Sequence, residues 1–92
     1  MIICAISPFD KEQEIIVLDT KNQRRERSFF PLEDLPKHLV EIAKRENEDR
    51  IFVYNGKIYF DYLQSKIDEL NSGNDKVNLF LAYEKEYLCQ RN

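Results

Sequence analysis

The chain has 92 residues, of which 42% are hydrophobic and 34% are charged, and its net charge is −3. This length suits one domain with a modest core, and the composition is that of a folded globule and not of a disordered chain. The negative charge gives no global tendency to bind nucleic acid. No segment approaches the roughly 20 apolar residues of a membrane span. We therefore expect a single domain over residues 1–92, without a membrane segment.

The N-terminal apolar run at residues 2–6 does not have the features of a signal peptide, because it is short, lacks a basic flank and soon meets Pro8. We expect a cytoplasmic protein. Cys4 lies inside this run and Cys89 lies near the other end of the chain. The apolar surroundings of Cys4 favour a buried, inert thiol over a disulfide between the two.

Three antiparallel strands are predicted at the start of the chain. The first covers residues 2–6 and is ended by Pro8, and a polar turn over 9–13 leads to the second strand over 14–19. A third strand over about 26–30 is plausible from the pattern. Its charged residues suit the edge of a sheet, where they discourage pairing with another molecule.

A helix is predicted over residues 31–47. Leu35, Leu39 and Ile42 recur at spacings of three and four, which places them on one helical face. Pro36 is tolerated only in the first turn, so the regular helix begins near it.

A buried strand follows over 51–54, and the Asn-Gly pair at 55–56 allows two interpretations. The pair favours a type I′ turn, after which 57–60 returns as a strand and Asp61 caps a helix. In the alternative, a helix begins almost at once and makes a crossover between two strands. We expect the hairpin by a small margin.

Under either interpretation a second helix ends near Gly73, and 77–83 is predicted as a strand covered on both faces. Residues 84–92 form a charged C-terminal tail. The predicted fold class is α+β, bordering on α/β: a mixed sheet of five to six strands in the order β-β-β-α-β-(β)-α-β with two main helices.

This order of elements, without the extra hairpin strand, resembles the ribonuclease H-like superfamily and especially its Holliday-junction-resolvase-like members. Ile6-Ser7-Pro8 is similar to the end of that family's first strand, and residues 35–54 look like its first helix and fourth strand. The family's metal site has an acid at each of two positions where this chain has Ser7 and Tyr54-Asn55. The resemblance therefore implies a non-catalytic relative, since two-metal cleavage requires those carboxylates.

We predict no catalytic residues, no metal site and no cofactor. His38, the only histidine, has no orienting partner in the sequence and is expected to face solvent. A nucleophilic pair of Cys4 with His38 is disfavoured because Cys4 lies in an apolar strand. Five acidic residues could in principle bind a metal ion, but roles in turns, in a helix cap and on the surface explain their positions better. They are Asp10, Asp19, Asp61, Asp68 and Glu69.

The best nucleic-acid signal is a basic stretch that adjoins Phe29 and Phe30. It contains Lys21, Arg24, Arg25 and Arg27. Arginines could bind phosphates while an aromatic ring stacks on a base. The competing interpretation is a solvated hairpin whose phenylalanines enter the core.

Five tyrosines are many for this length, and tyrosine is enriched at protein interfaces. A surface containing Tyr54, Tyr59, Tyr62 and Tyr87 is a candidate protein-binding face. Tyr83 is the fifth tyrosine. Ordinary sheet packing is the alternative explanation.

We expect a non-enzymatic interaction or regulatory protein that binds another protein or a second copy of itself. The composition, rich in Ile, Lys, Asn, Glu and Tyr, is typical of AT-rich genomes such as those of low-GC bacteria and their phages, and a phage or another mobile element is the expected source of such a regulator. One alternative is a nucleic-acid-binding accessory protein that uses the basic hairpin. Another is a metal-dependent nuclease with displaced acids.

Overall fold

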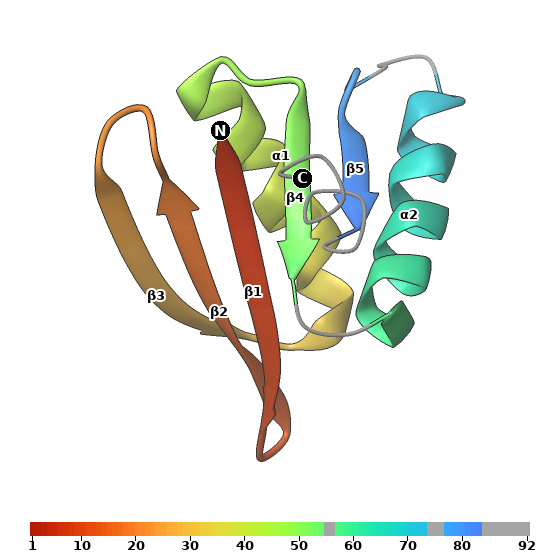
Figure 1. The fold of residues 1–92 in the computed structure, drawn as a ribbon. Helices are drawn as coiled ribbons and strands as arrows, with labels where there is room; N and C mark the ends of the chain where they lie inside the picture. The colour runs from red at the N-terminus through yellow and green to blue at the C-terminus, as the bar shows by residue number, and fades with distance from the viewer. Residues whose placement is uncertain (55–56, 74–76, 84–92) are drawn as a thin grey trace.

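The computed structural model describes residues 1–54, 57–73 and 77–83. These residues form a five-stranded mixed sheet and two α-helices, so the predicted α+β class is confirmed (Figure 1). The elements in chain order are β1 (Ile2–Phe9), β2 (Glu12–Asp19), β3 (Arg24–Phe30), the 3₁₀ turn η1 (Leu32–Asp34), α1 (Leu35–Glu46), β4 (Arg50–Tyr54), α2 (Lys57–Asn71) and β5 (Phe80–Tyr83).

The strands lie in the order β3-β2-β1-β4-β5. β1, β2 and β3 are joined by short turns and pair antiparallel, as expected for strands connected in this way. β4 is parallel to β1 on one side and to β5 on the other. A parallel neighbour requires a crossover connection, and here α1 and α2 provide the crossovers.

The hydrophobic core lies on one face of the sheet, between the strands and both helices. Alternate residues of β1 point into it because successive side chains of a strand face opposite ways. In the view of Figure 1, α1 lies behind the strands. The fully buried residues of the core include Ile2, Cys4 and Ile6 from β1, Ile15 from β2, Leu35, Leu39 and Ile42 from α1, Ile51 and Val53 from β4, and Leu63 and Ile67 from α2.

The predicted first helix is confirmed, with more detail at its two ends. Pro36 is the second residue of α1, where its missing N–H costs no helical hydrogen bond. Asn47 ends the helix in the left-handed conformation, with φ 54° and ψ 46°. Asparagine tolerates this conformation better than most residues and is a common helix stop.

The expectation that Pro8 ends the first strand was wrong, because β1 continues to Phe9 and only two residues form the turn. Pro8 lies opposite Gln13 of β2, whereas the pairing of β1 with β4 stops at Ala5. At Pro8, the edge of β1 that faces β4 therefore forms no ladder with that strand. Proline is accepted at such an edge position since no ladder hydrogen bond is lost there.

The favoured hairpin after β4 was also wrong, and the crossover alternative is correct. Residues 55–56 lie outside the described residues, but 57–60 form the first turn of α2 and not a strand. Both edges of β4 are occupied by β1 and β5, so no edge is left for a hairpin partner. Asp61 lies inside α2 instead of capping it, and its carboxylate accepts a hydrogen bond from Lys57 Nζ at 3.1 Å.

The last strand is shorter than predicted, because β5 begins only at Phe80. Asn78 has a positive φ of 52°, and its N–H donates to Asn71 Oδ1 at 3.0 Å. This bend holds residues 77–79 out of the sheet. The prediction that both faces are covered was also wrong for Phe80, whose side chain is exposed. The predicted tail over 84–92 lies outside the described residues.

Truncating Leu63 to alanine is expected to destabilise the protein by about 2–5 kcal/mol, because a fully buried leucine leaves a cavity in the core. Ile58 lies on the same helix but is 84% exposed, so Ile58→Ala serves as the matched control, with a change below about 0.5 kcal/mol. Urea unfolding of both variants measures the difference. Similar losses for the two would contradict the placement of α2.

Candidate functional site

The face of the sheet opposite α1 and α2 is a candidate binding surface. The strand register identifies its residues, because partners in neighbouring strands point to the same side. We call this surface the helix-free face. It consists of Ile3, Ala5, Ser7 and Phe9 from β1, Glu12, Glu14, Ile16 and Leu18 from β2, Arg25, Arg27 and Phe29 from β3, Arg50, Phe52 and Tyr54 from β4, and Phe80 and Ala82 from β5.

Exposed apolar side chains are concentrated on this face. Seven large hydrophobic residues of the described chain are well exposed, and five of them belong to the helix-free face. The remaining two, Ile58 and Leu70, lie on α2. The five are Phe9, Leu18, Phe29, Tyr54 and Phe80, with exposed fractions from 37% to 57%. Clustering of this kind marks interaction sites more often than singly scattered apolar residues do.

Part of the helix-free face is buried. Phe52 and Ala82 are among the buried residues, and they lie opposite each other in β4 and β5. On β1, Ile3 and Ala5 are half-buried, and Leu18 beyond them on β2 is exposed. Each of the five strands thus contributes one well-exposed apolar side chain to this face, while Phe52 and Ala82 are buried.

An aromatic contact marks the end of the face at the β1–β2 turn. The rings of Phe9 and Phe29 lie 5.0 Å apart, and the Arg27 guanidinium lies 5.0 Å from the Phe29 ring. Arg27 Nε also donates to Glu14 Oε2 at 2.7 Å. The charge of Arg27 is therefore satisfied within the sheet, and its position over Phe29 is fixed.

The four cations of the predicted nucleic-acid site are divided between two sides of the sheet. Lys21 lies in the β2–β3 turn, and Arg25 and Arg27 belong to the helix-free face. Arg24 points to the other side, where its Nη1 contacts Glu46 Oε1 of α1 at 3.3 Å. The structure therefore does not bring the four together into one patch.

A polar cluster joins the ends of β2, β3 and α1. The Asp19 carboxylate is buried and accepts hydrogen bonds from the Asn22 side chain at 2.8 Å and from the Lys21 and Asn22 N–H groups. Asn22 Nδ2 also donates to Glu46 at 3.0 Å. The Asn22 side-chain hydrogen bond is the main cause that lowers the pKa of Asp19. The prediction that Asp19 begins a turn is confirmed.

Glu46 in this cluster has a nearly buried side chain, 6% exposed, and it is held by arginines from two elements. Arg45 Nε contacts Glu46 at 2.9 Å, and the other end of Arg45 contacts Glu26 at 2.9 Å. Each carboxylate already has a cationic or amide partner. We conclude that the cluster connects α1 to β3 and that its carboxylates have a structural role.

The expectation that His38 faces solvent was wrong. The imidazole is half-buried and lies against the Phe30 ring, with 4.2 Å between the two ring centroids. Its Nε2 atom is buried and has no hydrogen-bond partner. Burial is the main cause that lowers the pKa of His38, partly opposed by Glu41 and Glu26. The ring acts as a packing group between β3 and α1.

Cys4 is fully buried in β1, as predicted, and burial raises the pKa of its thiol to about 12. A thiol with such a pKa is a poor nucleophile. Cys89 lies outside the described residues. Within the described chain, no group of three or more His, Cys, Asp or Glu side chains is placed to hold a metal ion.

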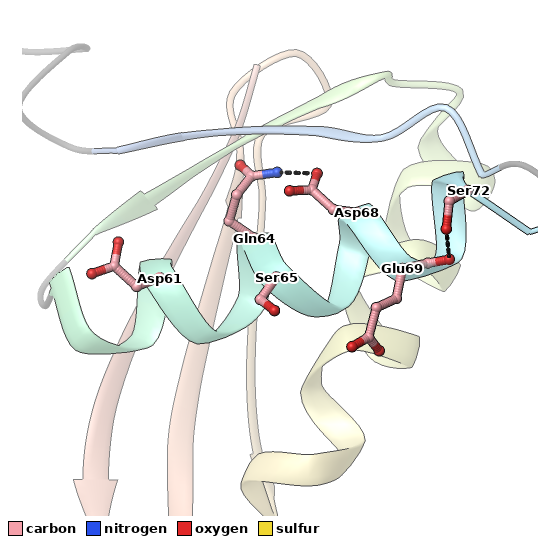
Figure 2. Close-up of a pocket in the computed structure, with 6 residues that line it drawn as sticks. All are labelled: Asp61, Gln64, Ser65, Asp68, Glu69 and Ser72. Atoms are coloured by element: carbon pink, nitrogen blue, oxygen red, sulfur yellow. Dashed lines mark hydrogen bonds between the residues drawn. The ribbon is translucent and has the colours of Figure 1, made fainter.

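The acids weighed as metal ligands lie in three separate places. Asp10 is in the β1–β2 turn, and Asp19 is in the polar cluster. The other three, Asp61, Asp68 and Glu69, lie on α2 along a shallow hollow shown in Figure 2. The hollow is lined by Asp61, Gln64, Ser65, Asp68, Glu69 and Ser72.

All six lining residues of this hollow come from α2 or the residue just after it, so no second element supplies a converging group. Gln64 donates to Asp68 at 2.8 Å, and the Ser72 hydroxyl donates to the Glu69 carbonyl at 2.9 Å (Figure 2). Asp61 and Asp68 are seven residues apart, about 10 Å along a helix. The hollow is the outer surface of one helix and has no feature of an active site.

The tyrosines of the candidate protein-binding face do not share one surface. Tyr54 is exposed on the helix-free face, whereas Tyr59 and Tyr62 of α2 pack against the core. Tyr83 faces α2, with its ring 5.4 Å from that of Phe60. Tyr87 lies outside the described residues.

Sequence reasoning missed Phe9, Leu18 and Phe80 as exposed surface residues. Phe80 belongs to a segment predicted as a strand covered on both faces, and Leu18 lies in a predicted strand whose neighbouring residues are also apolar. The register could have identified them only if the positions of both helices were known. Comparison with known proteins adds no assignment, since no protein-family model and no curated protein matches the chain.

His38 gives a pH-dependent stability with a defined sign. Its pKa in the folded protein is below the ordinary value of 6.5, so folding favours the neutral ring. The stabilising contribution is complete above the unfolded pKa, and it is lost as pH falls below that value toward the folded pKa. Since the chain has one histidine, His38→Phe should remove this dependence. Urea unfolding of the wild type and the variant between pH 8 and 5, roughly the histidine range, checks this prediction. Unfolding free energies that change equally with pH in both proteins would contradict it.

Asn22→Ala is expected to raise the pKa of Asp19, because it removes the side-chain donor that lowers it most. The stability that Asp19 contributes is present above its unfolded pKa and lost as pH falls through its folded pKa, so in the variant this contribution should be smaller and its loss should be complete at a higher pH. Carboxyl-carbon NMR titration measures the shift. Gln64→Ala, which removes a similar hydrogen bond on α2, is the control and should leave Asp19 unchanged.

Proposed function

We propose that this protein acts by binding another protein through the helix-free face of its sheet. The observation that carries the proposal is the concentration of exposed apolar side chains there, five of the seven in the described chain. Leaving a phenylalanine or leucine in water forgoes roughly 1.5–3 kcal/mol of burial each. Because the five side chains are 37% to 57% exposed, a partner that covers them would recover part of that free energy.

The polar residues of the helix-free face support a protein partner. Its cations are three arginines, without a lysine, and its acids are two glutamates. Protein interfaces are enriched in arginine and aromatic residues and depleted in lysine, glutamate and aspartate, so the support comes from the arginines and not from the glutamates. Tyr54 and the phenylalanines add large side chains with few rotatable bonds, which are frequent hot spots.

A nucleic-acid partner is less well supported. Two of the four candidate cations, Arg24 and Arg27, are already bound to Glu46 and Glu14. A chain with a net charge of −3 also lacks the general attraction to phosphates that nonspecific binding requires.

We propose further that the protein is a non-catalytic relative of the ribonuclease H-like superfamily. The crossover from β4 through α2 to β5 supports this, since it yields the element order on which the resemblance is based, without an extra strand. Ser7 and Tyr54 occupy the described positions where that family has acids. A cytoplasmic regulator encoded by a phage or another mobile element is the form of this proposal that the composition supports.

Leu18→Asp is expected to abolish capture of the partner, because it replaces an exposed apolar side chain of the helix-free face with a charge that the partner would have to bury. Ile58→Asp makes the same chemical change at a more exposed residue on α2 and is the matched control. Proteins captured from lysate of the source cells by the wild type and the two variants should be compared by mass spectrometry. Circular dichroism should show that both variants are folded.

A partner retained by the wild type and Ile58→Asp but lost from Leu18→Asp would support the proposal. Recovery of the same partner by folded Leu18→Asp would show that the helix-free face is not the binding surface.

A further inference from the structure

We propose that the partner binds the helix-free face through an extended acidic segment, with an apolar residue between two carboxylates. The apolar residue covers Leu18 and Ile3, and the carboxylates bind Arg25 and Arg50. This inference rests on the proposed function and specifies the chemistry of the partner for that surface.

The arginines of the described chain differ in whether an acidic side chain already pairs with them. Arg24, Arg27 and Arg45 each form an ion pair with a glutamate. Within the described part of the chain, Arg25 and Arg50 form none, and both are exposed. They are the two cations of the helix-free face that remain available to an anionic partner.

Arg25 and Arg50 lie on either side of apolar residues of the helix-free face. Arg25 lies opposite Leu18, and Leu18 lies opposite Ile3 on β1. Ile3 in turn lies opposite Phe52, two residues after Arg50 on β4. Three strand spacings of about 4.8 Å and two residues of about 3.3 Å place the two arginine Cα atoms roughly 16 Å apart. Apolar side chains fill the space between them.

An extended peptide segment matches the spacing of these arginines and apolar residues. In an extended chain, residues i, i+2 and i+4 point to the same side, and i and i+4 are about 13 Å apart. Long arginine and glutamate side chains can cover the remaining distance. An acid at i, an apolar residue at i+2 and an acid at i+4 therefore match the pattern Arg25, Leu18 with Ile3, and Arg50. Charge complementarity of this kind fixes the register of a complex.

A peptide fits this pattern better than a single-stranded nucleic acid does. Bases bind to sheets by stacking on aromatic rings, whereas the surface between the two arginines contains the aliphatic Leu18 and Ile3. The ring pair Phe9 and Phe29 lies at the opposite end, beside Glu14. Because Glu14 is paired with Arg27, neither residue offers an unpaired cation to a phosphate beside these rings.

A second copy of the chain also fits less well. The carboxylates that it could offer from its own helix-free face are Glu12 and Glu14. Glu14 is already bound to Arg27, which leaves Glu12 for two arginines. One of the two arginines would remain without a partner in such a dimer.

A displayed library of random dodecapeptides selected on the immobilised full chain tests the inference. The enriched sequences should contain an acid, an apolar residue and an acid at i, i+2 and i+4. A synthetic peptide of the enriched sequence should lose about tenfold or more in affinity for Arg25→Glu and for Arg50→Glu. Lys44→Glu, at an exposed cation of α1, is the charge-matched control and should bind as the wild type does.

The double variant with both arginines changed to glutamate should instead select peptides with basic residues at i and i+4. This reversal is a gain that a folding defect could not produce.

The outcomes separate the two proposals. Peptides that need Leu18 but bind equally to the arginine variants would overturn the acidic segment and leave the binding face intact. Enriched peptides unaffected by Leu18→Asp, or no enrichment at all, would count against the binding face itself. Tighter binding of oligothymidylate than of any peptide, dependent on Arg25 and Arg50, or a dimer in solution that Leu18→Asp dissociates, would overturn the inference in favour of those occupants.

Discussion

The pairing of β1 along both of its edges is the constraint on which the rest of the structure depends. β1 joins the antiparallel strands β2 and β3 to the parallel pair β4 and β5. Its core-facing residues Ile2, Cys4 and Ile6 are fully buried. Because β4 runs parallel to both β1 and β5, the chain needs a crossover connection before and after β4, and these connections are α1 and α2. Both helices pack into the same core.

Placing both helices on one side leaves the other side of the sheet without a described helix. The strands nevertheless carry apolar residues on both sides, as in Ile15 with Ile16 and Val17 with Leu18. Such sequences are usual where a sheet is covered on both faces. The helix-free face therefore has the composition of a buried surface while much of it is exposed, which is the physical basis for assigning it to a partner.

Much of the fold could be predicted from local patterns. The spacing of Leu35, Leu39 and Ile42 gave α1, and the short polar turn gave the β1–β2 pair. The choice at residues 55–56 could not be made locally, since Asn-Gly suits a hairpin and the stripe that includes Leu63 and Ile67 suits a helix. The deciding factor is that both edges of β4 are occupied, which is a property of the whole sheet.

The candidate site was harder to predict for a related reason. Exposure of Leu18 and Phe80 depends on which face the helices cover, and their own neighbours in sequence carry no such information. The basic stretch was visible, but the ion pair between Arg24 and Glu46 joins residues 22 positions apart. The packing of His38 against Phe30 likewise depends on how α1 meets the edge of the sheet.

The attachment of β3 has a consequence for motion. Among the described strands this edge strand pairs with β2 alone, and its contacts with α1 include the ring pair Phe30–His38 and the ion pairs Arg24–Glu46 and Glu26–Arg45. Dissolved salt weakens such partly exposed ion pairs while leaving apolar packing in place. Backbone amides of β3 should thus exchange with deuterium sooner than those of β1, and the gap should widen as ionic strength rises.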